Sequence, residues 1–345
     1  MDKILTILVP TYNMEQYLHK CLDSLLIQDE ELLNRFEVLV INDGSKDLSS
    51  IIAHKYQSKY PTVFRVIDKE NGNYGSCINR GFKEARGKYV KILDADDSFD
   101  TEVFSSYLLF LSSIDADMVI TDYMTVDERG RIGRIATYPL PARGIFYISE
   151  IKNNVNIEMH ALTYRSSMLR EMKYYQTEGI SYTDVEWSVI PLRKVEIVAY
   201  FPKILYLYLV GRQGQTIDTN VKIKNVSMMN RVLLSIIQDY CNNVHHGEDL
   251  YLRGKIMKHA DTIYKLYLST DLDKNDLECL DLKIKTMSTD IYDLLNQCVI
   301  SRYFPFHYIR AWRHGKTCSL FFVWKAYNIA HKVRNFFVSK LPWFM

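Results

Sequence analysis

Four short apolar runs, each five or six residues long, punctuate the first hundred residues of the chain. They lie at residues 4–9, 37–41, 63–67 and 89–93. Short runs rich in Val and Ile, without polar alternation, are typical of strands buried on both faces, as in a parallel sheet. Between the runs, apolar residues recur at helical spacing, over residues 14–27, 46–59 and 75–86. The alternation of strand and helix predicts a doubly wound α/β sheet.

Polar clusters directly follow three of the four apolar runs. They are residues 10–13 (PTYN), 42–45 (NDGS) and 94–97 (DADD). In open α/β sheets, ligands bind at the carboxyl ends of the strands. We therefore expect the three clusters, although far apart in sequence, to meet at one edge of the sheet.

After about residue 124 the pattern becomes mixed, and short strands are predicted near residues 159–164 and 195–209. From residue 220 to 297 the apolar spacing predicts helices. The sequence predicts a catalytic domain at residues 1–218, with one half at 1–125 and a second half at 126–218. A helical region at 219–298 and a tail at 299–345 follow it.

Composition narrows the class of protein. With 345 residues, 48% hydrophobic and 24% charged, the chain fits an ordinary globular protein and not a disordered or disulfide-rich one. No apolar run reaches the roughly 18 residues of a membrane-spanning helix. The first ten residues lack a secretory signal, and the six cysteines are scattered without metal-like spacing. These features predict a cytoplasmic protein with reduced thiols.

The small net charge of +2 hides an asymmetry along the chain. Residues 301–345 hold eight Lys or Arg and thirteen aromatic residues but no Asp or Glu, whereas residues 1–300 carry a net −6. Over residues 319–338, Lys325, His331 and Lys332 share one helical arc opposite a Phe- and Val-rich arc, in which Arg334 is the exception. This composition is typical of an interfacial helix, which predicts an anionic membrane surface as the partner of residues 299–345. The alternative is a core helix with a solvated basic face.

The DADD cluster suits a hard cation. Asp94, Asp96 and Asp97 place three carboxylates within four residues, and Mg²⁺ or Mn²⁺ prefers one or two carboxylates together with substrate phosphates. A solvated turn, or Asp97 as a helix cap, is the alternative. Asp43 either caps the following helix or accepts a hydrogen bond from a nucleobase or ribose.

Glycines punctuate the segment before the fourth run. Gly72, Gly75 and Gly81, with Asn79, form a helix start that lets a ligand approach the backbone. The segment is neither a Walker loop nor a dinucleotide-binding GxGxxG motif.

The order of these motifs resembles that of the inverting family 2 glycosyltransferases, which have the GT-A fold. The resemblance rests on PTYN, EVLVINDGSKD and NGNYGSCINRGFKEARGKYVKILDADD, covers about residues 3–125 and continues more weakly to 215. It implies that UDP-sugar is bound by a set of residues from these motifs, namely Pro10, Thr11, Tyr12, Glu15, Asp43, Gly75, Asn79 and Asp94. It also implies Asp96 as a metal ligand, with Asp97 as a second candidate.

Two further residues follow from the resemblance. In GISYTDVEWSV the family's catalytic base corresponds to Asp184, with Thr183 in place of the usual Glu. Glu186 is the runner-up for the base, although helical spacing favours a role as a structural partner. Arg212 corresponds to an Arg that meets the diphosphate; a surface Arg is the alternative. The chain departs from the family at Ile78, where many relatives have Arg.

Together these features predict a metal-dependent inverting glycosyltransferase of the surface-polysaccharide type. We expect it to move a sugar from a UDP-sugar to a hydroxyl of a saccharide acceptor, polyprenyl-linked, at the inner face of the plasma membrane, and to bind no nucleic acid. One alternative is a nucleotidyltransferase, although PTYNMEQY lacks its basic, Gly-rich triphosphate loop. Another is a non-catalytic membrane- or nucleic-acid-binding protein, against which the acidic body argues.

Overall fold

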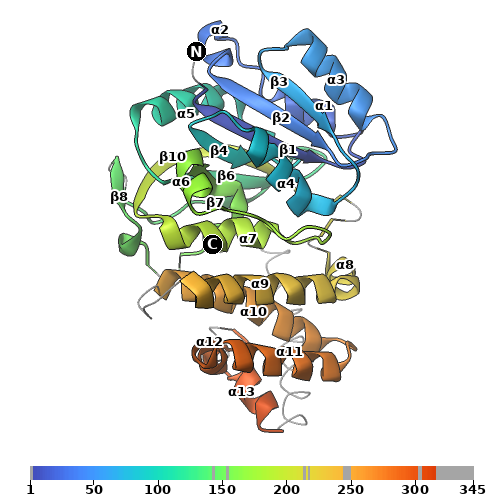
Figure 1. Ribbon diagram of the computed structural model, residues 1–345, viewed down its shortest axis with the longest axis vertical. Helices are drawn as coiled ribbons and strands as arrows, with labels where there is room; N and C mark the ends of the chain where they lie inside the picture. Colours follow the sequence, from blue (N-terminus) through green and yellow to red (C-terminus); the bar gives the residue numbers. More distant parts are fainter. Residues whose placement is uncertain are drawn as a thin grey trace. The chain divides into compact units, whose positions relative to one another are not determined.

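A ten-stranded mixed sheet dominates the first part of the chain in the computed structural model (Figure 1). The structure describes residues 3–141, 144–152, 155–212, 215–216, 218–243, 250–301 and 305–315. The chain divides into two units, residues 1–255 and 256–345. The domain boundaries expected from the sequence at residues 218 and 298 stay predictions.

The four predicted strands are confirmed and pair in parallel. They are β1 (Leu5–Thr11), β2 (Phe36–Asn42), β3 (Phe64–Asp68) and β4 (Tyr89–Ile92). They lie in the order β3-β2-β1-β4. Every residue of β2 and β4 is buried, including the charged Glu37 and Lys91, which explains why these runs show no polar alternation.

The second half of the sheet continues as β9-β6-β10-β5. These strands are β9 (Leu162–Arg165), β6 (Met118–Val126), β10 (Ile197–Leu209) and β5 (Ser98–Phe99), while β7 (Ile132–Ala136) pairs with β6 and β8 (Ile145–Tyr147) with β10. Strand β9 is antiparallel to both β4 and β6, and β6 is parallel to β10. Strands β6 and β10 therefore run in the same direction as β1, β2 and β4, and their carboxyl ends reach the same edge.

Helices cover both faces of the parallel strands. Helix α4 (Asn73–Glu84) packs on one face, where a Cβ at Gly81 would lie 2.8 Å from Ile41 Cδ1. Helix α5 (Thr101–Ser113) packs on the other, where the Phe104 ring meets Phe36 at 5.0 Å. Residues 36 and 41 point to opposite faces because side chains alternate along a strand. The predicted doubly wound α/β fold is thus confirmed.

The other helices of the first unit are short, except α3 and α9. They are α1 (Leu18–Asp23), α2 (Glu30–Leu33), α3 (Ser49–Lys59), α6 (Ser166–Glu171), α7 (Asp184–Val189), α8 (Thr219–Lys224) and α9 (Val226–Asn243). Short 3₁₀ helices occupy Ile148–Glu150, Met159–Ala161 and Ile190–Lys194. Of the helix predicted over residues 14–27, only the part that forms α1 is α-helical.

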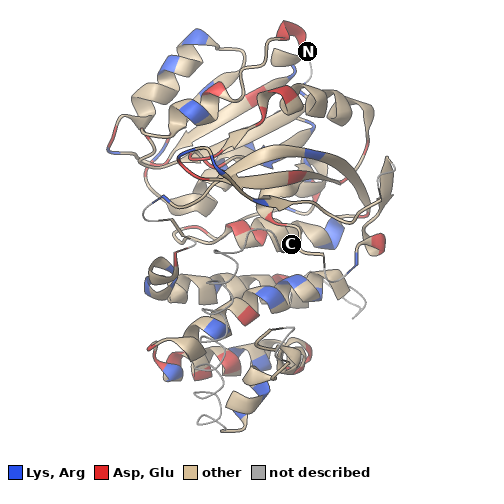
Figure 2. Ribbon diagram, turned by 180° about the vertical axis from the view of Figure 1, so that it is seen from behind, with Lys and Arg blue, Asp and Glu red and all other residues tan. Residues whose placement is uncertain are grey.

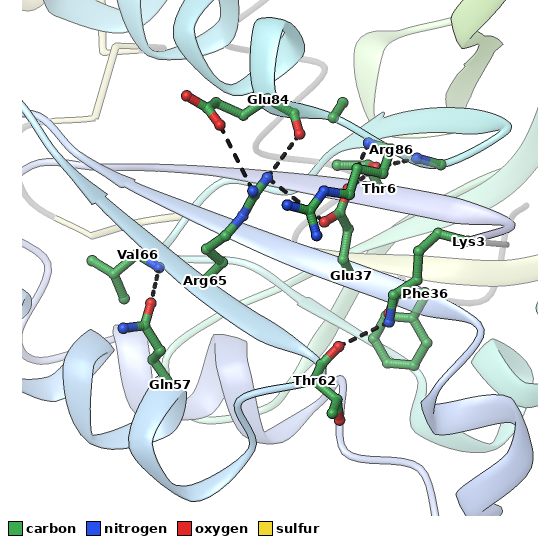
Figure 3. Close-up of polar contacts among 12 residues, drawn as sticks. Lys3, Thr6, Phe36, Glu37, Gln57, Thr62, Arg65, Val66, Glu84 and Arg86 are labelled. Atoms are coloured by element: carbon green, nitrogen blue, oxygen red, sulfur yellow. Dashed lines mark hydrogen bonds and ion pairs between the residues drawn. The ribbon is translucent and has the colours of Figure 1, made fainter. Parts of the chain in front are cut away.

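A buried carboxylate ties the strands together at the amino end of β2 (Figure 3). Glu37 Oε1 accepts hydrogen bonds from the Thr6 hydroxyl (2.8 Å) and from the Arg86 N–H (2.6 Å). The Arg65 guanidinium lies 3.7 Å from the other oxygen and also donates to the Glu84 carbonyl. The cluster joins β1, β2 and β3 to the residues after α4.

The second unit is helical, as predicted. Helix α10 (Leu250–Ser269) crosses the division and is followed by α11 (Lys274–Met287), α12 (Thr289–Leu294), a 3₁₀ turn (Leu295–Gln297) and α13 (Tyr308–Arg313). Arg313 is paired with Asp281 at 2.6 Å and lies 3.5 Å from the Tyr292 ring centroid. Acidic and basic residues are mixed along these helices (Figure 2).

Most of the predicted basic tail, residues 299–345, lies outside the described residues, so its membrane-binding face stays a prediction. Arg313, one of its cations, is engaged by Asp281. Of the helices that the structure describes, none combines the length and the apolar character needed to span a bilayer.

Candidate active site

A cleft of about 370 Å³ opens at the carboxyl edge of the sheet. Seven residues predicted from the sequence line it: Pro10, Thr11, Tyr12, Asp43, Asp94, Asp96 and Arg212. They come from the ends of β1, β2, β4 and β10, whose common direction brings them to one edge. The three strand-end clusters therefore meet, as the strand pattern predicted.

The backbone around the cleft adopts unusual conformations. Asn13, Asn73 and Tyr182 have positive φ angles of 53°, 65° and 70°. Asn tolerates this region, but a bulky Tyr there costs roughly 1–2 kcal/mol. The Tyr182 hydroxyl donates to the Thr216 carbonyl at 3.3 Å, which links two loops at the rim of the cleft. The strained residue stands two positions before Asp184.

Asp94 and Asp96 bring two carboxylates into the cleft. The Tyr74 hydroxyl donates to Asp94 Oδ1 at 2.9 Å. Burial, reinforced by the charge of Asp96, raises the pKa of Asp94 to about 7. Asp96 Oδ2 accepts from Arg212 Nε at 2.6 Å, and the guanidinium also lies over the Tyr17 ring. The cluster is thus a pair of carboxylates with one positively charged side chain, that of Arg212, beside it.

Asp97 has a different environment from its two neighbours. It is buried and does not line the cleft. Its Oδ2 accepts from the Tyr206 hydroxyl at 2.6 Å and its Oδ1 from the Leu209 N–H at 2.7 Å. Burial and the nearby carboxylates raise the pKa of Asp97. These contacts attach the aspartate turn to β10 and occupy both carboxylate oxygens.

Asp43 is almost completely buried and its contacts define one wall of the cleft. Its Oδ1 accepts from Lys69 Nζ at 2.6 Å and from the Gly72 N–H at 2.9 Å. Its backbone carbonyl accepts from the Asn71 amide at 3.0 Å. Asp43 follows β2 directly, so the strand fixes its main chain while the loop after β3 fixes its side chain.

Three predicted nucleotide-binding residues lie away from the cleft lining. Glu15 Oε2 accepts from the Leu48 N–H at the start of α3, at 2.9 Å. A Cβ at Gly75 would lie 2.2 Å from the Thr177 carbonyl oxygen, so glycine permits a close approach of two protein segments. The Asn79 side chain accepts from the Gln176 N–H at 2.8 Å and donates to the Gln176 carbonyl at 2.9 Å. These contacts organise loops that border the site.

Asp184 begins α7, close enough to Asp94 for its charge to contribute to the raised pKa of Asp94. Burial raises the pKa of Asp184 itself. Glu186 is completely buried and accepts two hydrogen bonds of 2.7 Å from the N–H and hydroxyl of Thr177. It therefore serves as a structural partner of the loop that precedes α7.

Several residues of the site were not singled out from the sequence. Tyr74 and Tyr208 line the cleft, and Lys69 holds Asp43. Behind Tyr208 lies His160, stacked at 4.2 Å; burial, together with the charge of Lys91, lowers the pKa of His160 to about 3. Lys69 carried one available signal: it directly follows β3, the neighbour of β2.

The described residues contain no group of three or more His, Cys, Asp or Glu placed to hold a metal ion. Asp94 and Asp96 nevertheless fit Mg²⁺ or Mn²⁺, because these ions take one or two carboxylates and complete their shell with phosphate and water. Burial first, and then the charge of Asp96, raises the pKa of Asp94, and a bound cation would offset both effects. Asp97, with both oxygens occupied, does not fit as a ligand.

Comparisons with known sequences agree with the geometry. The model of the family described as Glycosyl transferase family 2 matches residues 6–176. An uncharacterized glycosyltransferase of Mycoplasma genitalium, MG025, is 40% identical over 224 residues, which cover 63% of this chain and 71% of that protein. The minor teichoic acid biosynthesis protein GgaB of Bacillus subtilis is 22% identical over 324 residues, covering 91% of this chain and 35% of GgaB.

Among solved structures, S. aureus TarS (residues 1–349) in complex with UDP-GlcNAc has a similar fold. The TM-score is 0.63 at 16% sequence identity, covering 84% of this chain and 82% of that one. At this identity the likeness concerns the fold alone, and it confirms the GT-A architecture expected from the motifs.

Proposed function

Because the chain belongs to glycosyltransferase family 2, we propose that it transfers a sugar from a UDP-sugar to a hydroxyl of a saccharide acceptor, with inversion at the anomeric carbon. TarS, solved with UDP-GlcNAc, and GgaB, named for teichoic acid biosynthesis, support this donor and acceptor class. A nucleotidyltransferase or a non-catalytic binding protein no longer has support, since the matched region includes all three strand-end clusters.

The observation that carries the proposal is the convergence of Asp43, Asp94, Asp96 and Arg212 on one cleft, with Asp184 beside it. A nucleoside diphosphate requires a partner for the base, a contact for the ribose and positive charge for the diphosphate. Asp43 and Arg212 both line the cleft, so it can offer a partner for the base and positive charge for the diphosphate.

Asp184 is the proposed general base. Burial raises its pKa, which makes its carboxylate a stronger proton acceptor than an exposed Asp. It would take the proton of the acceptor hydroxyl as that oxygen attacks the anomeric carbon from the side opposite the diphosphate. A single displacement of this kind inverts the anomeric centre and needs no second nucleophile.

Asp94 and Asp96 would hold a divalent cation, Mg²⁺ or Mn²⁺, whose charge offsets the charge that develops on the leaving diphosphate. Arg212, now paired with Asp96, would add a guanidinium on the same side. Tyr74 keeps Asp94 in place through its hydroxyl. Asp97 supports the turn from β10.

We further propose a polyprenyl-linked acceptor in surface-polysaccharide synthesis and peripheral attachment to the inner face of the plasma membrane through residues 299–345. The acid-free, aromatic composition of the tail supports this attachment. Flotation with liposomes rich in phosphatidylglycerol checks it: the chain should float, and a variant with neutral residues at Lys325, Lys332 and Lys340 should stay at the bottom. Equal flotation of both would contradict it.

The activity itself is tested by UDP release. The protein is incubated with Mn²⁺, a saccharide acceptor and each of several UDP-sugars, beginning with UDP-GlcNAc, and the anomeric configuration of the product is read by NMR. Asp184→Asn should bind UDP as the wild type does yet transfer about 100- to 10,000-fold more slowly. Absence of both UDP binding and UDP release would reject the proposal, and a retained configuration would reject inversion.

A further inference from the structure

The ammonium of Lys69 has all of its hydrogen-bonding capacity engaged on one wall of the cleft. Nζ donates to Asp43 Oδ1 at 2.6 Å, to the Glu70 carbonyl at 2.6 Å and to the Ser76 hydroxyl at 2.9 Å. A lysine ammonium carries three donors and no acceptor, so these three contacts saturate it. The Lys69 side chain is mostly buried, and its charge is therefore directed at Asp43 and away from bulk solvent.

The same contacts fix one oxygen of Asp43, and the Cys77 thiol is a further hydrogen-bonding neighbour of this carboxylate. Oδ1 accepts from both Lys69 and the Gly72 N–H, whereas Oδ2 takes part in neither bond. The wall is closely packed at Gly72, where a Cβ would lie 2.6 Å from the Ser76 hydroxyl and 3.2 Å from Lys69 Nζ. Asp43 thus lines the cleft as a carboxylate held in one orientation by a buried ion pair.

We propose that Lys69 is a positioning residue that holds Asp43 as a fixed hydrogen-bond acceptor and thereby selects a nucleobase with a ring N–H. The inference rests on the proposed nucleotide-sugar function. Uracil presents N3–H, which matches a carboxylate oxygen. Cytosine presents a bare N3 at the same place, and two acceptors facing each other in a buried site leave both without a partner.

A purely structural role for Lys69 makes a different prediction. In that case Lys69 only attaches the loop after β3 to β2, and its loss would lower the affinity for all nucleotides by the same factor. Ser76 offers a matched control, because it accepts from the same ammonium and donates to the Asn73 carbonyl at 2.7 Å without touching Asp43. Lys46 offers a charge control: it is exposed and lines the same hollow beside the cleft as Lys69.

The test measures the affinities of UDP and CDP by calorimetry in the presence of Mg²⁺. Wild-type protein should prefer UDP by about 100-fold. Lys69→Met should lower the affinity for UDP about 10- to 100-fold and the affinity for CDP less than about threefold, so that the preference for UDP largely disappears. Lys69→Arg should restore most of it, while Ser76→Ala and Lys46→Met should keep the wild-type ratio. Lys69→Gln repeats the test with a neutral side chain that is still able to donate hydrogen bonds.

Each outcome separates the inference from the function on which it rests. If the affinities for UDP and CDP fall equally in the Lys69 variants, the role of Lys69 is only structural and the inference fails, although the glycosyltransferase proposal stands. If wild-type protein binds UDP and CDP equally, Asp43 does not read the base and the inference also fails. If wild-type protein binds neither nucleotide, the proposed function fails first. Melting temperatures identify any variant whose loss of binding reflects unfolding.

Discussion

At the scale of single residues, Arg212 would compete with a divalent cation at the proposed site for the same carboxylate. Arg212 Nε lies 2.6 Å from Asp96 Oδ2, and both side chains are largely buried. An opposite charge this close stabilises the ionised carboxylate but also occupies one of its oxygens. Under the proposed function, Arg212 would therefore have two opposite effects: it would oppose binding of the cation alone and favour binding of the diphosphate.

Arg212→Gln should separate these two effects. Without the guanidinium, Mn²⁺ alone should bind several-fold more tightly, because Asp96 no longer has a cation partner, whereas the KM for the UDP-sugar should rise about 10- to 100-fold through loss of a charge-assisted hydrogen bond. Electron paramagnetic resonance of free Mn²⁺ measures the first quantity and initial rates the second. Arg131→Gln, at an exposed pair with Asp127, is the control. Weaker Mn²⁺ binding in the Arg212 variant would contradict this account.

The sequence could predict those site residues that stand at the carboxyl ends of strands. Asp43 and Asp94 follow β2 and β4, so parallel pairing alone brings them together. Lys69 also follows a strand, β3, but its contact with Asp43, like that of Tyr74 with Asp94, is a side-chain contact across loops, which no spacing rule encodes. Asp97 illustrates the converse, since its neighbours in sequence face the cleft while its own oxygens are bound to β10.

At the scale of elements, burial on both faces decided which strands were predictable. Strands β1, β2 and β4 are buried along nearly their whole length because helices cover both sides of them, whereas the edge strand β3 is only partly buried. Strand β6 was not predicted: Thr121 and Asp122 interrupt its apolar pattern, although both are buried in the sheet. The Asp122 carboxylate accepts from the Tyr200 hydroxyl at 2.6 Å, a tertiary contact that the local sequence does not reveal.

Strand β4 carries a buried lysine that should make stability depend on pH. Lys91 Nζ donates to the His160 and Leu162 carbonyls, and burial lowers the pKa of Lys91 to about 7. In the unfolded chain a lysine keeps its proton up to about pH 10.4. Between these values the unfolded state binds more protons, so the contribution of Lys91 to folding stability rises with pH and is least favourable below pH 7.

Urea denaturation of wild-type protein and Lys91→Met from pH 7 to pH 9 tests this expectation. The free energy of unfolding of the wild type, relative to the variant, should increase by roughly 1 kcal/mol per pH unit, because the variant has no group to titrate there. Taking the difference cancels the contributions of the other titrating groups. A difference that stays constant or falls with pH would show that Lys91 remains protonated in the folded protein.

At the scale of the whole molecule, the two ends of the parallel strands have separate tasks. Glu37 and Asp43 belong to the same strand region, about 20 Å apart at the usual rise of a strand. Asp43 faces the cleft, whereas Glu37 binds Thr6, the Arg86 N–H and Arg65 at the opposite edge (Figure 3). One end of the sheet is thus available for ligand binding while the other holds the strands and α4 together.

Glu37→Gln should therefore destabilise the protein without changing its site. The amide keeps the shape of the side chain, but it removes a buried charge that accepts from Thr6 and Arg86 and faces Arg65, so the free energy of unfolding should fall by about 1–3 kcal/mol. The Kd for UDP should change less than about twofold. Glu84→Gln, which removes a more exposed partner of Arg65 in the same cluster, should change stability by less than about 0.5 kcal/mol. Unchanged stability in Glu37→Gln together with weaker UDP binding would mean that the two ends of the sheet are coupled, because a substitution at one edge would then act on the ligand at the other.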